Sequence, residues 1–573
     1  MAHWQERLEA WRNYADLETS LKEEIQNSSE AELEDAFGQE LEFGTAGLRG
    51  IIGAGTNRMN RYIIRQTTEG MARWIEKQGD QAKEKGVVIS YDNRHFSREF
   101  ALEAACVLGA HGIKSYVFSK LHPTPLLSFA VRYLACEAGI MVTASHNPPN
   151  YNGYKVYGSD GGQFPPQAAN ELTEIIREIE SPFTVEVADQ DELVEAGMLT
   201  FVGEDVVEAY MEELKTVTVD PSVAEENGDL LNIIFSGMHG TSAVVVDEVF
   251  KTAGFSHYHL VEEQMVLDPD FSTVESPNPE TEPAFDLSKV YGEKYDADIL
   301  FATDPDADRL GVVVRRGADD YVMLSGNQVA SLMFHYIASR KSEMQTLPEN
   351  SALVRSIVST PFVDEIAKDF DVDVFEVLTG FKFVGDQIKA FERTGSHEFL
   401  MGFEEAIGYL IRPYVRDKDS LQAISLVAEI ATYYKAKGQN LLDALEELYE
   451  KYGYYMEETI SVQYPRLSGK EKMAQIMSDV RSTNFEAIGG LKVERVDDYL
   501  KQISVGADGK ETPIKQSKSN VLRYKFADKS WLALRPSGTE PKIKLYMGGV
   551  GQNRAEALQK IEQMKQDMIQ KIK

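Results

Sequence analysis

The chain has 573 residues, 43% of them hydrophobic, a length that corresponds to about three to five domains of roughly 150 residues each. Acidic residues outnumber basic ones by 92 to 59, which gives a formal net charge of -33 at pH 7. This charge argues against nucleic acid or an anionic membrane as the main partner, so any anionic ligand must bind in a locally basic pocket.

The two cysteines, Cys106 and Cys136, both lie in apolar stretches. They form neither a disulfide framework nor a CxxC metal motif, which favours buried thiols and a reducing, cytoplasmic location. The N-terminal residues lack the apolar core of a signal peptide, and no stretch approaches about 18 apolar residues. We therefore expect a soluble, untargeted protein.

Residues 1–40 carry apolar side chains three, four and six positions apart among many charges, which predicts amphipathic helices. We interpret them as a helical arm on the first domain; a dimerisation element is the alternative. The glycine-rich stretch 43–50, which contains Arg49, matches a phosphate-binding loop only loosely. It fits neither the dinucleotide fingerprint nor the P-loop, so NAD and ATP are excluded there.

A strand, helix, strand pattern then occurs three times, and each unit is followed by a further apolar strand that ends in a polar loop. Short helices between strands favour right-handed crossovers and mixed or parallel sheets. Because ligands collect beyond the carboxyl ends of strands, the three loops can face one cleft. The predicted units are 87–91, 99–108, 115–118; 231–235, 243–252, 257–261; and 352–358, 362–370, 372–377, with the further strands at 138–144, 299–303 and 399–402.

The first polar loop contains the candidate nucleophile Ser145, followed by His146. Pro148 and Pro149 fix φ and remove two backbone donors, so the loop cannot continue as a strand or a helix and presents its side chains. Lys155, ten residues after the serine, adds a cation. A surface serine in an ordinary proline turn is the alternative interpretation.

The second loop carries Asp304, Asp306 and Asp308, two residues apart. If Pro305 keeps the segment extended, this spacing projects the three carboxylates to one side. Carboxylates this close repel one another unless a cation lies among them, and oxygen ligands favour Mg²⁺ over zinc. An EF-hand is excluded, because Arg309 stands at the sixth position of the loop, where glycine is needed. A helix cap or a solvated acidic turn is the alternative.

A fourth segment begins near residue 455, and we interpret it as a small α+β lid domain. One of its strands leads into Arg535, Ser537, Gly538 and Thr539. A guanidinium, two hydroxyls and an unobstructed backbone suit a tetrahedral dianion, with a plain turn as the alternative. A serine, a carboxylate metal site and a phosphate clamp favour phosphoryl transfer, since an acyl-transfer serine needs a G-x-S-x-G elbow.

Four motifs in this order resemble those of the α-D-phosphohexomutase family, and the resemblance covers almost the whole chain beyond the arm. They are TASHNP at 143–148, DPDADR at 304–309, a glutamate loop at 403–408 and RPSGTEPK at 535–542, supported by GTAGLRG at 44–50, PNPE at 277–280, TGFKFVG at 379–385 and RDKD at 416–419.

This resemblance implies three similar mixed-sheet α/β domains plus a C-terminal α+β domain around a central cleft. The domains expected are a helical arm with a phosphoserine domain (1–205), a metal-binding domain (206–320), a sugar-binding domain (321–450) and a phosphate-binding domain (451–573).

The resemblance also implies roles for individual residues. Ser145 would carry a phosphoryl group bound to Mg²⁺, with Asp304, Asp306 and Asp308 as the other metal ligands. Catalytic roles are expected for Arg49, His146, Lys155 and Lys418, and substrate contacts for Arg309, Thr379, Gly380, Glu404, Arg535, Ser537, Gly538 and Thr539.

The implied activity is that of an isomerase that moves a phosphoryl group between positions of a sugar phosphate. Our hypothesis is that glucose 1-phosphate is the main substrate and glucose 1,6-bisphosphate the intermediate. Ala406 stands where the family usually has a serine on the sugar, which leaves a phosphopentomutase or a broad hexose/pentose mutase, including mannose, as the alternative. A further alternative is a protein that binds sugar phosphates but does not turn them over. Small-molecule sugar phosphates are the expected partners, and a monomer or weak dimer the expected assembly.

Overall fold

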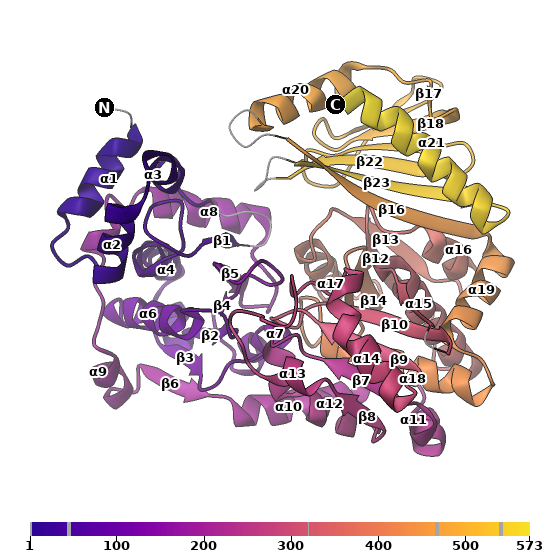
Figure 1. The fold of residues 1–573 in the computed structure, drawn as a ribbon, viewed down its shortest axis with the longest axis horizontal. Helices are drawn as coiled ribbons and strands as arrows, with labels where there is room; N and C mark the ends of the chain where they lie inside the picture. The colour runs from indigo at the N-terminus through magenta and orange to yellow at the C-terminus, as the bar shows by residue number, and fades with distance from the viewer. Residues whose placement is uncertain (1–2, 43–46, 319, 465–468, 538–541, 573) are drawn as a thin grey trace. The chain divides into compact units, whose positions relative to one another are not determined.

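The computed structural model describes residues 3–42, 47–318, 320–464, 469–537 and 542–572. The chain divides into two compact units, each assembled from two stretches of sequence. The first comprises Met1–Gly326 and Phe381–Asn440, and the second comprises Asn327–Gly380 and Leu441–Lys573. Figure 1 labels their helices and strands.

A six-stranded mixed sheet organises the N-terminal part of the first unit. Its order is β1 (Leu48–Ile51), β5 (Tyr151–Gly158), β4 (Ala138–Val142), β2 (Val87–Tyr91), β3 (Ser115–Phe118) and β6 (Leu199–Val202). Strands β2, β3, β4 and β6 are parallel, whereas β5 and β1 pair antiparallel. The helices are α4 (Arg61–Glu76), α5 (Asp80–Lys85), α6 (Ser97–Ala110), α7 (Thr124–Tyr133), α8 (Pro166–Arg177) and α9 (Gln190–Glu195), with the 3₁₀ turn η1 (Pro182–Thr184).

The first predicted unit is confirmed in this sheet. Strands β2 and β4 are buried along their whole length, as continuous apolar runs predict for parallel strands covered on both faces. The expected helix at 99–108 lies inside α6. The strand expected at 138–144 ends two residues earlier, at Val142, because the chain already turns toward Ser145.

The N-terminal arm consists of α1 (His3–Asn13), α2 (Thr19–Asn27) and α3 (Glu30–Phe37). Its apolar side chains form one cluster with Ala54 and Tyr62 of the following domain. Trp11 is the centre of this cluster, in edge-to-face contact with Tyr62 and Phe183. The arm therefore packs against its own chain, as an apolar stripe at helical spacing predicts.

A second mixed sheet follows in the same unit. Its order is β11 (Asp320–Leu324), β10 (Leu310–Gly317), β9 (Ile299–Thr303), β7 (Ile233–Ser236) and β8 (Tyr258–Leu260), with β7 parallel to β8 and β9. The helical segments are α10 (Glu204–Leu214), η2 (Lys215–Val217), α11 (Pro221–Asn227), η3 (Gly228–Leu230), η4 (Thr241–Val244), α12 (Val246–Ala253), α13 (Glu262–Met265), η5 (Glu282–Phe285) and α14 (Asp286–Tyr295). The helix expected at 243–252 thus begins with a 3₁₀ turn before α12.

The last part of the first unit contains α17 (Lys382–Thr394), β14 (Glu398–Glu404), β15 (Gly408–Leu410) and α18 (Ser420–Ala436). Strands β14 and β15 form an antiparallel hairpin. The strand expected at 399–402 lies within β14, and the glutamate loop connects the two strands.

The second unit contains β12 (Ser351–Ser356) and β13 (Asp373–Val377), which pair in parallel, and the helices α15 (Gly326–Glu343), α16 (Phe362–Lys368) and α19 (Leu441–Tyr452). Its C-terminal sheet has the order β16 (Tyr454–Gln463), β23 (Lys542–Gly551), β22 (Trp531–Pro536), β21 (Leu522–Phe526), β18 (Leu491–Asp498), β19 (Ile503–Gly506) and β20 (Glu511–Pro513). Strand β17 (Ala487–Ile488) pairs with β18, and the helices are α20 (Gly469–Ser482) and α21 (Arg554–Ile572).

All strand pairs of the C-terminal sheet are antiparallel, and α21 lies along the sheet (Figure 1). The α+β interpretation of this segment is confirmed, as is the α/β class of the chain. Among the described residues, no helix is both long enough and apolar enough to cross a membrane.

Candidate active site

Ser145 lies in a sharp turn just beyond the carboxyl end of β4. Its backbone is left-handed, with φ of 50°, and its N–H donates to the Thr143 hydroxyl at 2.8 Å. The side chain is buried, and its Oγ donates to Asp304 Oδ2 at 2.6 Å. The His146 Nδ1 lies 3.3 Å from the same Oγ. The serine is therefore held against the aspartate loop and is not an ordinary surface residue.

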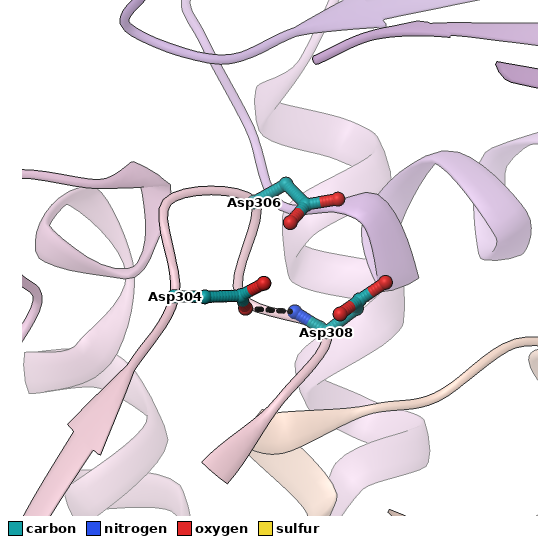
Figure 2. A group of neighbouring side chains, drawn as sticks. All are labelled: Asp304, Asp306 and Asp308. Carbon is teal, nitrogen blue, oxygen red and sulfur yellow. Dashed lines mark hydrogen bonds between the residues drawn. The ribbon is translucent and has the colours of Figure 1, made fainter. Parts of the chain in front are cut away.

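The aspartate loop, which follows β9, is a closed turn and not the extended segment expected from Pro305. The Asp304 carbonyl accepts from the Ala307 N–H at 2.9 Å, and Ala307 has a φ of 52°. Asp304 Oδ1 also accepts from the backbone N–H groups of Asp308, as Figure 2 shows, and of Arg309. Aspartate stabilises turns in this way by accepting from amides a few residues ahead, and this overrides the extended preference at proline.

The turn nevertheless brings the three carboxylates together. Asp304, Asp306 and Asp308 each offer an oxygen within 4.8 Å of the others, and all three are buried. Burial and the charges of its two neighbours raise the pKa of Asp304 well above its ordinary value. The Oδ1 atoms of Asp306 and Asp308 have no hydrogen-bond partner within the described parts of the chain. An all-oxygen set with unsatisfied, mutually repelling carboxylates fits a hard divalent cation such as Mg²⁺.

Two lysines border the carboxylates. The Lys155 Nζ on β5 lies 2.6 Å from Asp306 Oδ2 and 3.3 Å from Asp308 Oδ2. The Lys418 Nζ, just before α18, lies 3.2 Å from Asp308 Oδ2. Burial alone would lower the pKa of each ammonium group, but the neighbouring carboxylates outweigh it and raise both pKa values. Both lysines are therefore protonated at neutral pH and can donate, but not accept, a proton in this state.

Arg309 connects the aspartate loop to the glutamate loop. Its Nη1 donates to Glu280 Oε2 at 3.2 Å and to the Ala406 carbonyl at 3.4 Å. Glu404 ends β14 in a buried position, and burial raises its pKa to about 7 although Lys418 and Arg309 oppose the shift. The residue that replaces the expected serine, Ala406, thus contributes a backbone acceptor.

Arg49 reaches the serine turn from β1, where its Nη1 donates to Asn147 Oδ1 at 2.7 Å. Burial, together with the charges of Arg309 and Arg49, lowers the pKa of His146 well below its ordinary value. The imidazole is therefore neutral near pH 7. A neutral imidazole and a cationic guanidinium flank the turn that carries Ser145.

Sequence reasoning missed the contacts that two residues, Thr124 and Glu280, make in this site. The Thr124 hydroxyl donates to Asp306 Oδ2 at 2.8 Å, and the Thr124 N–H donates to the Asp306 carbonyl. The sequence around Thr124 does not predict these contacts, because Asp306 lies 182 residues away. Glu280, the partner of Arg309, lies in the PNPE motif, and the motif alone indicates no role for this side chain.

The remaining candidates belong to the second unit. Thr379 and Gly380 follow β13, and Gly380 has a φ of 118°. Arg535 lies in β22, and the Ser537 N–H donates to the Lys542 carbonyl at 2.8 Å. Gly538 and Thr539 lie outside the described residues. The first unit by itself brings together the candidates Arg49, Ser145, His146, Lys155, Asp304, Asp306, Asp308, Arg309, Glu404 and Lys418.

Family models of known proteins match four successive segments of the chain. Models of the phosphoglucomutase/phosphomannomutase α/β/α domains I, II and III match residues 40–183, 208–317 and 325–452, and the model of the C-terminal domain matches residues 486–563.

Two curated bacterial relatives are similar along nearly their full length. A phosphoglucomutase of Staphylococcus saprophyticus is 35% identical over 549 residues, which cover 95% of this chain and 97% of that protein. A phosphoglucomutase of Staphylococcus aureus is 37% identical over 557 residues, which cover 97% of this chain and 98% of that protein. The solved structure of pp63/parafusin from Paramecium has a TM-score of 0.70 at 18% identity, with 93% of this chain and 96% of that chain covered, which shows a shared fold.

Proposed function

The chain belongs to the phosphoglucomutase/phosphomannomutase family, and we propose that it is a phosphoglucomutase that interconverts glucose 1-phosphate and glucose 6-phosphate. The relatives that are 35% and 37% identical to it are phosphoglucomutases. The observation that carries the proposal is the 2.6 Å contact between Ser145 Oγ and Asp304 in a buried cluster of three carboxylates. A serine hydroxyl beside a site for a divalent cation suits phosphoryl transfer.

In the proposed reaction Ser145 carries the phosphoryl group. A sugar hydroxyl gives up its proton and its oxygen forms a bond to phosphorus as the bond from phosphorus to Ser145 Oγ breaks. Oγ takes up one proton, so one proton is lost and one is gained in the step. Glucose 1,6-bisphosphate results, and its other phosphate returns to Ser145 by the reverse step, which leaves the isomeric monophosphate. Such transfers depend mainly on positioning and electrostatic stabilisation.

We assign Asp304, Asp306, Asp308 and Ser145 as ligands of Mg²⁺, which when bound offsets the negative charge of the phosphoryl group. Their burial, unsatisfied oxygens and mutual repulsion support this assignment. Lys155 and Lys418, both protonated, are assigned to charge stabilisation and proton donation.

Around the serine turn, we assign Arg49 and neutral His146 to contact the phosphoserine. Arg309 and Glu404 are assigned to contact the substrate. The remaining substrate contacts are assigned to Thr379, Gly380, Arg535, Ser537, Gly538 and Thr539.

We divide the chain into an arm with a phosphoserine domain (1–205), a metal-binding domain (206–320), a sugar-binding domain (321–450) and a phosphate-binding domain (451–573). The order of the four matching family models supports this division. A monomer or weak dimer in the cytoplasm stays a prediction. Two buried free cysteines, Cys106 and Cys136, agree with a reducing compartment.

The proposal is tested by phosphoryl labelling. Wild-type protein incubated with Mg²⁺ and ³²P-labelled glucose 1,6-bisphosphate should retain label, and Ser145→Ala should retain none. An unlabelled wild-type protein would instead support a binding protein without turnover, and equal labelling of the two would exclude Ser145 as the acceptor.

The second candidate, a mutase that prefers pentose phosphates, rests on Ala406. Because this residue offers the sugar no hydroxyl, the hexose has one side-chain contact fewer than in the usual family loop. We expect kcat/KM to be higher for glucose 1-phosphate than for ribose 1-phosphate, and Ala406→Ser to widen the difference. A higher kcat/KM for ribose 1-phosphate would favour the phosphopentomutase.

A further inference from the structure

Beneath the serine turn lies a buried arginine, Arg94, which follows β2. Its guanidinium donates to four main-chain carbonyls of that turn. Its Nη2 lies 2.5 Å from the carbonyl oxygens of both Ser145 and Asn147. Its Nη1 lies 2.7 Å from the carbonyl oxygen of Pro148 and 3.1 Å from that of Tyr151. One side chain therefore contacts the turn from its first residue to its last.

The turn has two features that make such support necessary. Ser145 has a φ of 50°, a region that costs a residue with a side chain of order 1 kcal/mol or more. Pro148 and Pro149 carry no N–H, so the turn has few donors of its own for its inward-facing carbonyls. A buried carbonyl without a partner costs about 1–3 kcal/mol, and Arg94 satisfies the buried carbonyl of Ser145. Its contacts with Asn147, Pro148 and Tyr151 are part-buried, and the Pro148 carbonyl also accepts from the Tyr151 N–H.

Arg94 is itself held in place by Asp92 and Phe271. Its Nε lies 3.3 Å from Asp92 Oδ2, and both side chains are fully buried. Asp92 Oδ1 accepts from the Ser97 hydroxyl at 2.6 Å and from the Arg94 N–H at 3.0 Å. The Phe271 ring centroid lies 4.9 Å from the Arg94 guanidinium carbon, in cation–π contact. The guanidinium is thus held by Asp92, in the loop after β2, and by Phe271, in the loop after α13.

We propose that Arg94 is a positioning residue for phosphoryl transfer, which holds the turn in the conformation that directs Ser145 Oγ toward Asp304. This inference rests on the proposed function. Arg94 is not expected to contact the substrate, because its Nη1 and Nη2 groups already donate to the turn carbonyls. Lysine cannot replace it, since a single ammonium group has three donors around one atom and cannot span four carbonyls as a planar fork does.

The kinetic test compares Arg94→Lys with Arg98→Lys in the full-length protein with Mg²⁺ and glucose 1,6-bisphosphate. Arg98 lies four residues further along, on the exposed face of α6. Displacing a reacting group by about 1 Å can cost roughly 100-fold in rate. We expect kcat of Arg94→Lys to fall by about that factor with KM for glucose 1-phosphate close to the wild type. Its Tm should be lower, because the turn carbonyls lose donors, and Arg98→Lys should be unaffected. Millimolar guanidinium should restore part of the kcat of Arg94→Ala.

A readout independent of turnover separates this inference from the proposed function. Hydrogen exchange in peptides covering residues 143–152 should be faster in Arg94→Lys, with exchange in the two sheets unchanged. Wild-type kcat in Arg94→Lys or unaltered exchange in the turn would each overturn the inference. Exchange that is faster throughout the two sheets as well would indicate general unfolding and would also overturn it. If the wild-type protein has no mutase activity, the proposed function fails, and the exchange result alone decides whether Arg94 holds the turn.

Discussion

At the scale of single residues, the site is a buried group of alternating charges. Lys155 lies between Asp306 and Asp308, and Lys418 contacts Asp308 from another loop. Burying ions is costly unless each has a close partner, so removal of one member leaves another uncompensated. Burial and the charges of Asp306 and Asp308 raise the pKa of Asp304. For Asp306 the adjacent Lys155 ammonium outweighs burial and lowers the pKa.

The first prediction concerns Asp306→Asn. Asparagine keeps the shape and can still accept from Thr124, but it removes the negative charge beside Lys155. We expect kcat/KM to fall by 100-fold or more, corresponding to about 3 kcal/mol of transition-state stabilisation, with an unchanged circular dichroism spectrum. Asp320→Asn, on the β10–β11 hairpin, is the matched control and should retain activity. Near wild-type turnover of Asp306→Asn in EDTA would contradict the metal assignment.

The second prediction concerns pH and Glu404, whose pKa is raised by burial from 4.5 to about 7. Below that pH the side chain is a neutral acid, and above it a carboxylate, the better acceptor for sugar hydroxyls. We expect kcat/KM to rise with pH through about 7 and this component to vanish in Glu404→Gln. Glu405→Gln is the control. The substrate phosphate also ionises in this pH range, and its contribution to the pH profile remains in both variants, so only the Glu404 component should differ between them.

The same shift has a consequence for stability. Since the folded protein binds the Glu404 proton more tightly than the unfolded chain does, the stabilising contribution is complete below about pH 4.5 and is lost as the pH rises through about 7. Chemical unfolding measured at pH 5 and pH 8 should therefore differ less in Glu404→Gln than in the wild type. Equal pH dependence in the two proteins would show that this carboxyl is not buried as described.

At the scale of elements, the three polar loops share a backbone feature. The loops after β4, β9 and β14 each contain one non-glycine residue in the left-handed region, namely Ser145, Ala307 and Ile407, with φ of 50°, 52° and 49°. Such residues are uncommon, and they persist where the surrounding contacts impose them. The repeated units thus agree in the geometry of their turns as well as in their strand and helix order.

The third prediction concerns the N-terminal arm. Leu8 of α1 is 5% exposed in the arm cluster, whereas Leu558 of α21 is 49% exposed. We expect Leu8→Ala to lower the free energy of unfolding by about 2–4 kcal/mol, because it removes buried apolar surface and leaves a cavity. Leu558→Ala should cost less than about 1 kcal/mol. Equal effects in urea denaturation would mean that the arm does not pack on the first domain in solution.

At the scale of the whole molecule, the site is made by contacts between residues far apart in the sequence. Ser145 and Asp304 are separated by 159 positions, and Lys155 and Asp306 by 151. The first compact unit also includes residues 381–440, which supply Glu404 and Lys418 after the chain has passed through the second unit. The carboxylate cluster therefore depends on the folding of the whole first unit, and ligands that bind there should stabilise it.

The fourth prediction follows for metal removal. A cation that binds the folded but not the unfolded chain stabilises it by about 2.7 kcal/mol at 100 times its Kd. We expect Mg²⁺ to raise the Tm of the wild-type protein and EDTA to reverse the increase. Asp308→Asn should show little Mg²⁺ dependence, whereas Asp320→Asn should respond like the wild type. An equal increase in all three proteins would indicate general ion effects and not a specific site.

Features that depend on local pattern can be predicted from the amino-acid sequence alone. Continuous apolar runs identified β2, β4 and β9, helical spacing identified the arm, and four motifs identified the family. The spacing of Asp304, Asp306 and Asp308 is sufficient to predict a cation site. Three carboxylates so near one another in the sequence need a compensating positive charge in either an extended segment or a closed turn.

Which partners those side chains have depends on the tertiary structure. The aspartate loop is a closed turn, since hydrogen bonds to Asp304 outweigh the local preference at Pro305. The contact of Thr124 with Asp306 and the four contacts of Arg94 join segments whose sequences carry no sign of one another. Local pattern fixes where a strand ends and a turn begins, whereas the partner of a buried polar group is chosen by packing between distant segments.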